Sequence, residues 1–152
     1  MKKISLILLT ILLLVGCTKE KKTEVFSLDE ELYNNASIIE IDSSEFKELE
    51  KNKNNFAVFV HLSGCTSCSE FRKVLDSFTT ENNMTLYSIE YKEMKKTSIY
   101  KFVEYAPSLV LYKDGEMVKY LDSVSDEDLP FYEDVESFKK WFSKYVRMNY
   151  QK

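Results

Sequence analysis

Residues 56–68, FAVFVHLSGCTSC, join an apolar run to a pair of cysteines and decide the fold. The run at 56–62 is apolar on both faces, which predicts a central strand covered by helices on each side. Residues 63–64 end the strand. Apolar residues then recur at the spacing of one helix face: Phe71, Val74, Leu75 and Phe78. The stretch therefore predicts a buried strand followed by a helix with two thiols, Cys65 and Cys68, at its start.

The chain on either side of this stretch alternates between strand and helix patterns. Further strands are expected at residues 38–41, 84–91, 108–112 and 117–121. Further helices are expected from a cap at Ser43 or Ser44 to the Asn-rich turn at 52–55, over 93–105 and over 133–148. The early crossovers give parallel strand pairs, and the turn at 113–116 gives an antiparallel hairpin. The sequence predicts an α/β protein with a central mixed sheet of four to five strands flanked by helices.

The N-terminus carries an export pattern. Three residues, Met1-Lys2-Lys3, precede an apolar run at 4–15. The run is shorter than the roughly 20 residues that a membrane span needs, but it fits the apolar region of a secretory signal. The following Leu-Val-Gly-Cys string ends at Cys17 and resembles the bacterial lipoprotein signal, in which cleavage before the cysteine is coupled to diacylglycerol attachment on its sulfur. The resemblance implies a signal peptide at 1–16; the alternative is an uncleaved anchor with a passive Cys17.

Residues 18–36 are charged and polar with little periodicity. Such composition predicts a tether that holds a folded part off the membrane surface. We therefore expect lipidated Cys17 and a tether at 17–36, and a folded domain at 37–152. The location expected is the outer face of the cell membrane, and the Lys-, Asn-, Ile- and Tyr-rich composition favours a Gram-positive bacterium.

Charge and ligand counts exclude two classes of partner. The chain has 21 basic and 25 acidic residues, and removal of residues 1–16 takes away two of the lysines. An acidic protein without a basic patch has no electrostatic attraction to phosphate backbones, so no nucleic acid partner is expected. His61 is the only histidine and no second close cysteine pair exists. A four-ligand zinc centre then needs carboxylates, and no metal site is expected.

The two thiols have the spacing of a redox pair. An unperturbed thiol, with a pKa of about 8.5, is mostly protonated at neutral pH, but backbone N–H groups at a helix start stabilise a thiolate. Cys65 is therefore the expected nucleophile, aided by the hydroxyls of Thr66 and Ser67, and Cys68 is the expected resolving thiol. A structural disulfide is the alternative, although so short a loop restrains the unfolded chain little.

A second string adds to this pattern. Residues 106–116, APSLVLYKDGE, together with the dithiol and the order of elements, resemble the thioredoxin family over about residues 37–148. The resemblance implies a cis peptide bond before Pro107, which would leave the backbone of Ala106 as an extended edge for a substrate segment. Three features depart from the family pattern. Thr66-Ser67 replaces the Gly-Pro pair that usually stands between the two cysteines. Gly64 replaces the aromatic residue before the nucleophile, and Phe59 stands where family reductases often have a buried aspartate.

Three further features have two interpretations each. His61 lies on the strand face of Phe59 and is either a proton partner for the thiols or a partly packed strand-end residue. Tyr105 adjoins the Ala106-Pro107 loop and is either a docking residue or a core aromatic. The acidic run at 126–128 is either a solvated loop or a calcium site.

Two functions are compatible with these observations. The first is a membrane-tethered thiol-disulfide oxidoreductase, with no cofactor beyond the Cys65–Cys68 disulfide. Its expected partners are exported cysteine-containing proteins and a membrane partner that recycles the dithiol. The absence of a buried acid favours an oxidase or isomerase direction, and a reductant recharged by a membrane electron donor is the alternative. The second is a non-catalytic thioredoxin-like adaptor with a structural disulfide, which binds a partner through the Pro107 loop.

Overall fold

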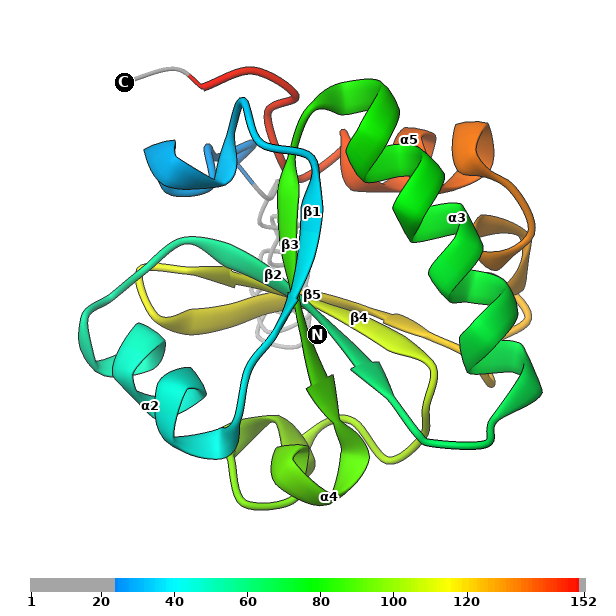
Figure 1. Cartoon of the computed structure of the whole chain (residues 1–152), viewed down its shortest axis with the longest axis horizontal. Helices are drawn as coiled ribbons and strands as arrows, with labels where there is room; N and C mark the ends of the chain where they lie inside the picture. The colour runs from blue at the N-terminus through cyan, green and yellow to red at the C-terminus, as the bar shows by residue number, and fades with distance from the viewer. Residues whose placement is uncertain (1–23, 151–152) are drawn as a thin grey trace, which may run out of the picture.

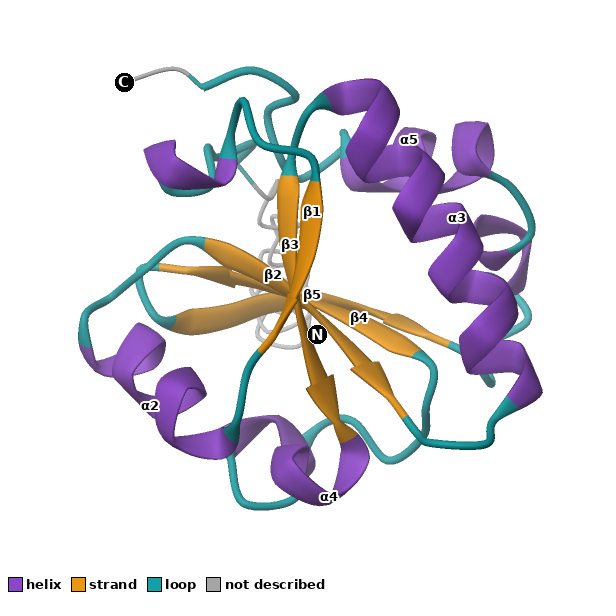
Figure 2. Ribbon diagram, viewed as in Figure 1, coloured by secondary structure: helices purple, strands orange, loops and turns teal. Residues whose placement is uncertain are grey.

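A five-stranded sheet forms the centre of the computed structural model, which describes residues 24–150. The strands are β1 (Ser37–Glu40), β2 (Phe56–His61), β3 (Thr85–Glu90), β4 (Ser108–Lys113) and β5 (Glu116–Asp122). They lie in the order β1-β3-β2-β4-β5 (Figure 2). Strands β1, β3 and β2 are parallel to one another, β4 is antiparallel to β2, and β5 is antiparallel to β4. The predicted mixed sheet is confirmed.

Helices cover both faces of the sheet. Figure 1 shows α2 (Ser43–Lys51) and α4 (Tyr91–Met94) on one side, and α3 (Thr66–Asn82) and α5 (Val135–Phe142) on the other. Three short 3₁₀ helices complete the described chain: η2 (Glu30–Leu32), η3 (Ser98–Lys101) and η4 (Leu129–Tyr132). Within residues 24–150, none of the helices has the length and apolar content to cross a bilayer.

Strand β2 is buried between these two layers, as its sequence predicts. Its first five residues are at most 1% exposed. On one face Phe59 contacts Phe71 of α3, with ring centroids 5.7 Å apart. Phe56 stacks on Tyr112 of β4 at 4.7 Å, and both rings meet Phe46 of α2 edge-on. Apolar burial of this kind contributes most of the stability of the sheet, and it fixes the end of β2 at which the cysteines follow.

The segment before β1 belongs to the fold, which corrects one prediction. Phe26 and Leu28 are 5% and 1% exposed. The N–H of Phe26 donates to the Tyr145 carbonyl at 2.9 Å, and the N–H of Arg147 donates to the Phe26 carbonyl at 2.8 Å. The prediction of a tether over 17–36 is therefore wrong for residues 24–36, because their apolar partners come from the far end of the chain. The rest of that tether, Cys17 and the signal peptide lie outside the described residues.

Two predicted helices are shorter in the structure. The expected helix at 93–105 divides into α4 and η3, because the hydroxyl of Thr97 accepts from Ile99 N–H and starts a new turn. The expected helix at 133–148 ends at Phe142, because Val146 pairs with Phe26 in an extended segment.

The first helix also has a different cap from the one predicted. Asp42 takes the place expected for Ser43 or Ser44, since its carboxylate accepts from the N–H groups of Ser44 and Glu45. A carboxylate at this position also interacts favourably with the positive end of the helix.

Candidate active site

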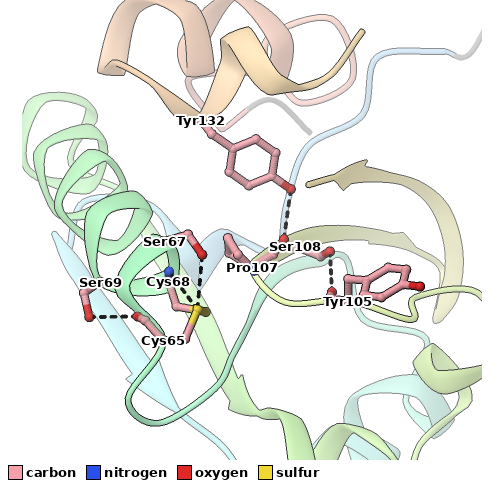
Figure 3. Close-up of a disulfide and its surroundings, with 8 residues drawn as sticks. All are labelled: Cys65, Ser67, Cys68, Ser69, Tyr105, Pro107, Ser108 and Tyr132. Carbon is pink, nitrogen blue, oxygen red and sulfur yellow. Dashed lines mark hydrogen bonds between the residues drawn. A yellow bond between two sulfur atoms is a disulfide. The ribbon is translucent and has the colours of Figure 1, made fainter. Parts of the chain in front are cut away.

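The two cysteines lie where β2 passes into α3. Residues 62–64 make the turn, in which Gly64 has a φ of 78°, a conformation that glycine adopts without steric penalty. Cys65 is the N-cap residue of α3, and Cys68 lies in its first turn. Their sulfurs form a disulfide, with the Cα atoms 5.2 Å apart (Figure 3).

The surroundings of the two sulfurs differ. The N–H of Cys68 donates to Sγ of Cys65 at 3.1 Å, and the hydroxyl of Ser67 lies 3.3 Å from the same sulfur. Cys65 is half-buried, whereas Cys68 is only 4% exposed. The first turn of α3 contains no acidic residue. Donors from a helix start therefore converge on Cys65, the arrangement that stabilises a thiolate.

Thr66 differs from Ser67 in its contacts. Its side chain is exposed, and no hydrogen bond joins its hydroxyl to either sulfur in the described part of the chain. Of the two hydroxyls expected to stabilise the Cys65 thiolate, that of Ser67 lies within hydrogen-bond distance of the sulfur.

The loop before β4 lies beside the disulfide, as Figure 3 shows for Pro107. The Ala106-Pro107 peptide bond is cis, Pro107 is buried and Ala106 is half-buried. The hydroxyl of Tyr132 donates to the Leu121 carbonyl at 2.7 Å, with the Pro107 carbonyl 3.2 Å away as a second acceptor. Burial raises the pKa of the Tyr132 phenol above its ordinary value. Tyr132 of η4 thus contacts the Pro107 loop through its hydroxyl, a contact that the sequence did not reveal.

The side chain of Tyr105 does not face the disulfide, although Tyr105 precedes the Ala106-Pro107 bond. Its carbonyl accepts from the Ser108 hydroxyl at 2.9 Å, and its side chain is 49% exposed. The ring points away from the sulfurs (Figure 3). It lines a separate cavity of about 170 Å³ with Phe102 and Val124.

His61 lies on the Cys68 side of the disulfide. Both residues line a cavity of about 270 Å³, which Phe59 and Arg72 also line. Nε2 of His61 is 3.0 Å from both carboxylate oxygens of Glu40.

The Glu40 carboxylate has a second partner. It accepts a hydrogen bond of 2.6 Å from the buried hydroxyl of Ser88. Sequence reasoning missed Glu40 and Ser88, because they stand on β1 and β3 and only the sheet register brings them to His61.

Phe59 stands at the position that was compared above with the buried aspartate of family reductases. It is 1% exposed, and the ring of His61 lies 5.6 Å from its own. His61 hydrogen-bonds to Glu40 on this side of the disulfide, and the guanidinium of Arg72, which lines the same cavity, pairs with Asp76 at 3.0 Å. Across residues 24–150, no three His, Cys, Asp or Glu side chains gather as a metal site.

Comparison with solved structures places this geometry in a known fold. The chain aligns with the reduced thioredoxin pre-protein of Schistosoma mansoni at a TM-score of 0.54 and 16% identity, over 72% of this chain and 99% of that one. The fold is that of thioredoxin. A protein proposed to be an oxidoreductase with a thioredoxin fold aligns at 0.51 and 21% identity, over 68% and 91%. The Trxlp protein of Edwardsiella tarda aligns at 0.52 and 12% identity, over 70% and 98%.

The likeness to thioredoxin is one of structure. No family model matches the sequence. No curated protein matches it either. Within this fold the Cys65–Cys68 disulfide lies beside the Pro107 loop (Figure 3), and the Ala106-Pro107 bond is cis.

Proposed function

We propose that this chain is a thiol-disulfide oxidoreductase that acts through Cys65 and Cys68. The observation that carries the proposal is the disulfide at the start of α3, beside the Pro107 loop of a thioredoxin fold. The convergence of the Cys68 N–H and the Ser67 hydroxyl on Cys65 supports its role as nucleophile.

The proposed reaction has two exchange steps. In the reducing direction the Cys65 thiolate attacks one sulfur of a substrate disulfide; a mixed disulfide forms and the other substrate sulfur leaves as a thiolate. Cys68 then gives up its proton and attacks Sγ of Cys65. The Cys65–Cys68 disulfide forms, the second substrate thiolate leaves, and the substrate has gained two electrons. Substrate oxidation is the reverse sequence.

His61 is the proposed proton acceptor for Cys68. Both line the same cavity, and Nε2 of the imidazole faces Glu40. If Nε2–H donates to Glu40, the Nδ1 lone pair is the atom that accepts a proton. This role supplies the base that Phe59 does not.

We infer an oxidase or isomerase direction from the same geometry. Contacts that stabilise the Cys65 thiolate favour the reduced form of the protein, and a stabilised reduced form makes the disulfide a stronger oxidant. Equilibration with glutathione tests this. The expected potential lies above the roughly −270 mV of thioredoxin, and a value below it would reverse the inferred direction.

The proposed location is the outer face of the cell membrane, through a lipid on Cys17. The sequence pattern of residues 1–17 supports this location. The substrates are then exported cysteine-containing proteins. Net oxidation or reduction of substrate transfers two electrons in each cycle, so turnover in either of those directions needs a partner that restores the starting redox state of Cys65 and Cys68. The proposed partner is a membrane protein.

Trapping of the mixed disulfide tests the enzymatic proposal. Cys68→Ala removes the intramolecular route that releases substrate, so covalent adducts sensitive to dithiothreitol should accumulate on Cys65 in cells. Cys65→Ala is the matched control and should form none. Non-reducing electrophoresis of both variants measures the difference.

A negative result has a defined meaning. If Cys68→Ala forms no adducts, and the purified wild-type protein neither reduces insulin nor oxidises a reduced peptide, the enzymatic proposal is wrong. A thioredoxin-like adaptor with a structural Cys65–Cys68 disulfide then takes its place.

A further inference from the structure

A cleft of about 550 Å³ lies at the start of α3 and shares no lining residue with the cavity of His61. One wall is α3, with Val74, and a second wall is the Ala106-Pro107 loop. The third wall comes from residues 123–133, with Leu129 and Tyr132. Ser67, whose hydroxyl lies 3.3 Å from the Cys65 sulfur, is on the rim. The volume lies in the range of ordinary ligand clefts, roughly 300–1,000 Å³.

The third wall is held in place by its own contacts. The carboxylate of Asp128 accepts from the N–H of Asp122 at 2.9 Å. The ring of Tyr132 lies 4.3 Å from that of Phe71, and its hydroxyl donates to the Leu121 carbonyl. A cleft whose walls are already ordered loses little entropy when a ligand binds.

The cleft combines an apolar floor with negative charge. Glu70 and Glu133 line it, and no lysine or arginine of residues 24–150 does so. Neither carboxylate has a hydrogen-bond or ion-pair partner among residues 24–150. Leu129 presents an apolar side chain that is 44% exposed. The acidic run at 126–128 belongs to the same wall segment and adds to the negative potential.

We propose that this cleft binds the residues that flank the reacting cysteine of a substrate polypeptide, and that it selects an apolar side chain next to a lysine or arginine. The inference rests on the proposed oxidoreductase function and names its substrate class. Apolar contact with Val74, Pro107 and Leu129 stabilises the first side chain, and Glu70 and Glu133 stabilise the second. The position beside Cys65 then brings the substrate sulfur within reach of the attacking thiolate.

Three peptides test this selection. Each carries one cysteine as a mixed disulfide with thionitrobenzoate, and the residues beside the cysteine are Leu and Lys, Leu and Glu, or Ala and Lys. Attack of the reduced protein on the peptide sulfur forms a Cys65–peptide disulfide and releases the thionitrobenzoate anion, whose absorbance gives the rate. The Leu-Lys peptide should react about three- to tenfold faster than the Leu-Glu peptide at low salt, the size expected for two exposed charge pairs.

Variants assign the selection to the cleft. Glu70→Gln with Glu133→Gln should remove most of the difference between the Lys and Glu peptides, as should added salt. Leu129→Ala should reduce the preference for Leu over Ala and leave the charge preference intact. Alkylation of Cys65 by neutral iodoacetamide serves as the control and should proceed at the wild-type rate in both variants.

The outcomes separate the two claims. Equal rates for the three peptides, with normal alkylation and release of thionitrobenzoate, overturn the cleft assignment and leave the oxidoreductase proposal standing. An unchanged charge preference in the Gln double variant does the same. A rate that falls as protein concentration rises shows that a second copy of the chain covers the cleft, which also overturns it. If no peptide reacts, the oxidoreductase proposal fails and the cleft assignment falls with it.

Discussion

Replacement of Leu28 by alanine tests whether the segment before β1 is part of the core. Leu28 is 1% exposed, and its N–H donates to the Tyr33 hydroxyl at 3.0 Å. That hydroxyl donates in turn to the Arg147 carbonyl at 2.9 Å, and Phe26 pairs with Val146. The side chain therefore lies where the two ends of the described chain meet, and its loss leaves a cavity there.

The size of the effect follows from burial. Truncation of a fully buried leucine costs about 2–5 kcal/mol. If the free energy of unfolding falls by about 3 kcal/mol and the urea m-value is about 1.5 kcal/mol per M, the urea concentration at the unfolding midpoint should fall by about 2 M. A domain with a total stability of about 5–15 kcal/mol remains folded in the absence of urea. A tether residue exposed to water would instead change the midpoint by a few tenths of M at most.

Urea unfolding followed by tryptophan fluorescence measures this midpoint, because the side chain of Trp141 in α5 is 2% exposed in the folded protein. Leu129→Ala is the matched control: it makes the same chemical change at a side chain that is 44% exposed, and it should shift the midpoint by less than half as much. Equal shifts for the two variants, or none for Leu28→Ala, would refute the placement of residues 24–36 in the core. A domain that starts at Ser37 loses the same contacts and should unfold at lower urea than one that starts at Glu24.

Three shorter predictions concern the site and the anchor. His61→Asn should slow release of the substrate by Cys68 about 10²-fold, the lower end of the effect of a general base. Glu40→Gln should have an intermediate effect, and the rate of Cys65 alkylation by iodoacetamide should not change. Equal release rates in the wild type and His61→Asn would exclude a base at this position. Burial raises the pKa of the Tyr132 phenol above its ordinary 10.0. The unfolded chain therefore ionises first, and stability present below pH 10 is lost above it; the loss should be smaller in Tyr132→Phe, as alkaline unfolding curves would show. Cys17→Ala should abolish fatty-acid labelling and membrane fractionation of the protein, and retention of the label would contradict the lipid anchor.

The elements around the site could be predicted because each has a local cause. The apolar run at 56–62 and the spacing of apolar residues after Cys65 are properties of neighbouring residues, and the structure places β2 and α3 there. The turn at 113–116 was likewise found, since Gly115 has a φ of 74° and the hairpin requires it. The ends of α4 and α5 were missed because a distant or side-chain contact decides them. Val146 leaves the helical pattern only because Phe26 is beside it.

The sequence by itself determined the succession of strands and helices and the pair Cys65 and Cys68 at a helix start, because periodicity and turn residues act over a few neighbours. The cis bond before Pro107 was implied by the resemblance of residues 106–116 to the thioredoxin family. The tertiary structure decided what surrounds the sulfurs. Glu40 and Ser88 reach His61 through the register of three strands, and Tyr132 reaches the Pro107 loop from a segment of 3₁₀ helix. These contacts join residues that are up to 48 positions apart. They depend on how packed layers align, which no local pattern of side chains records.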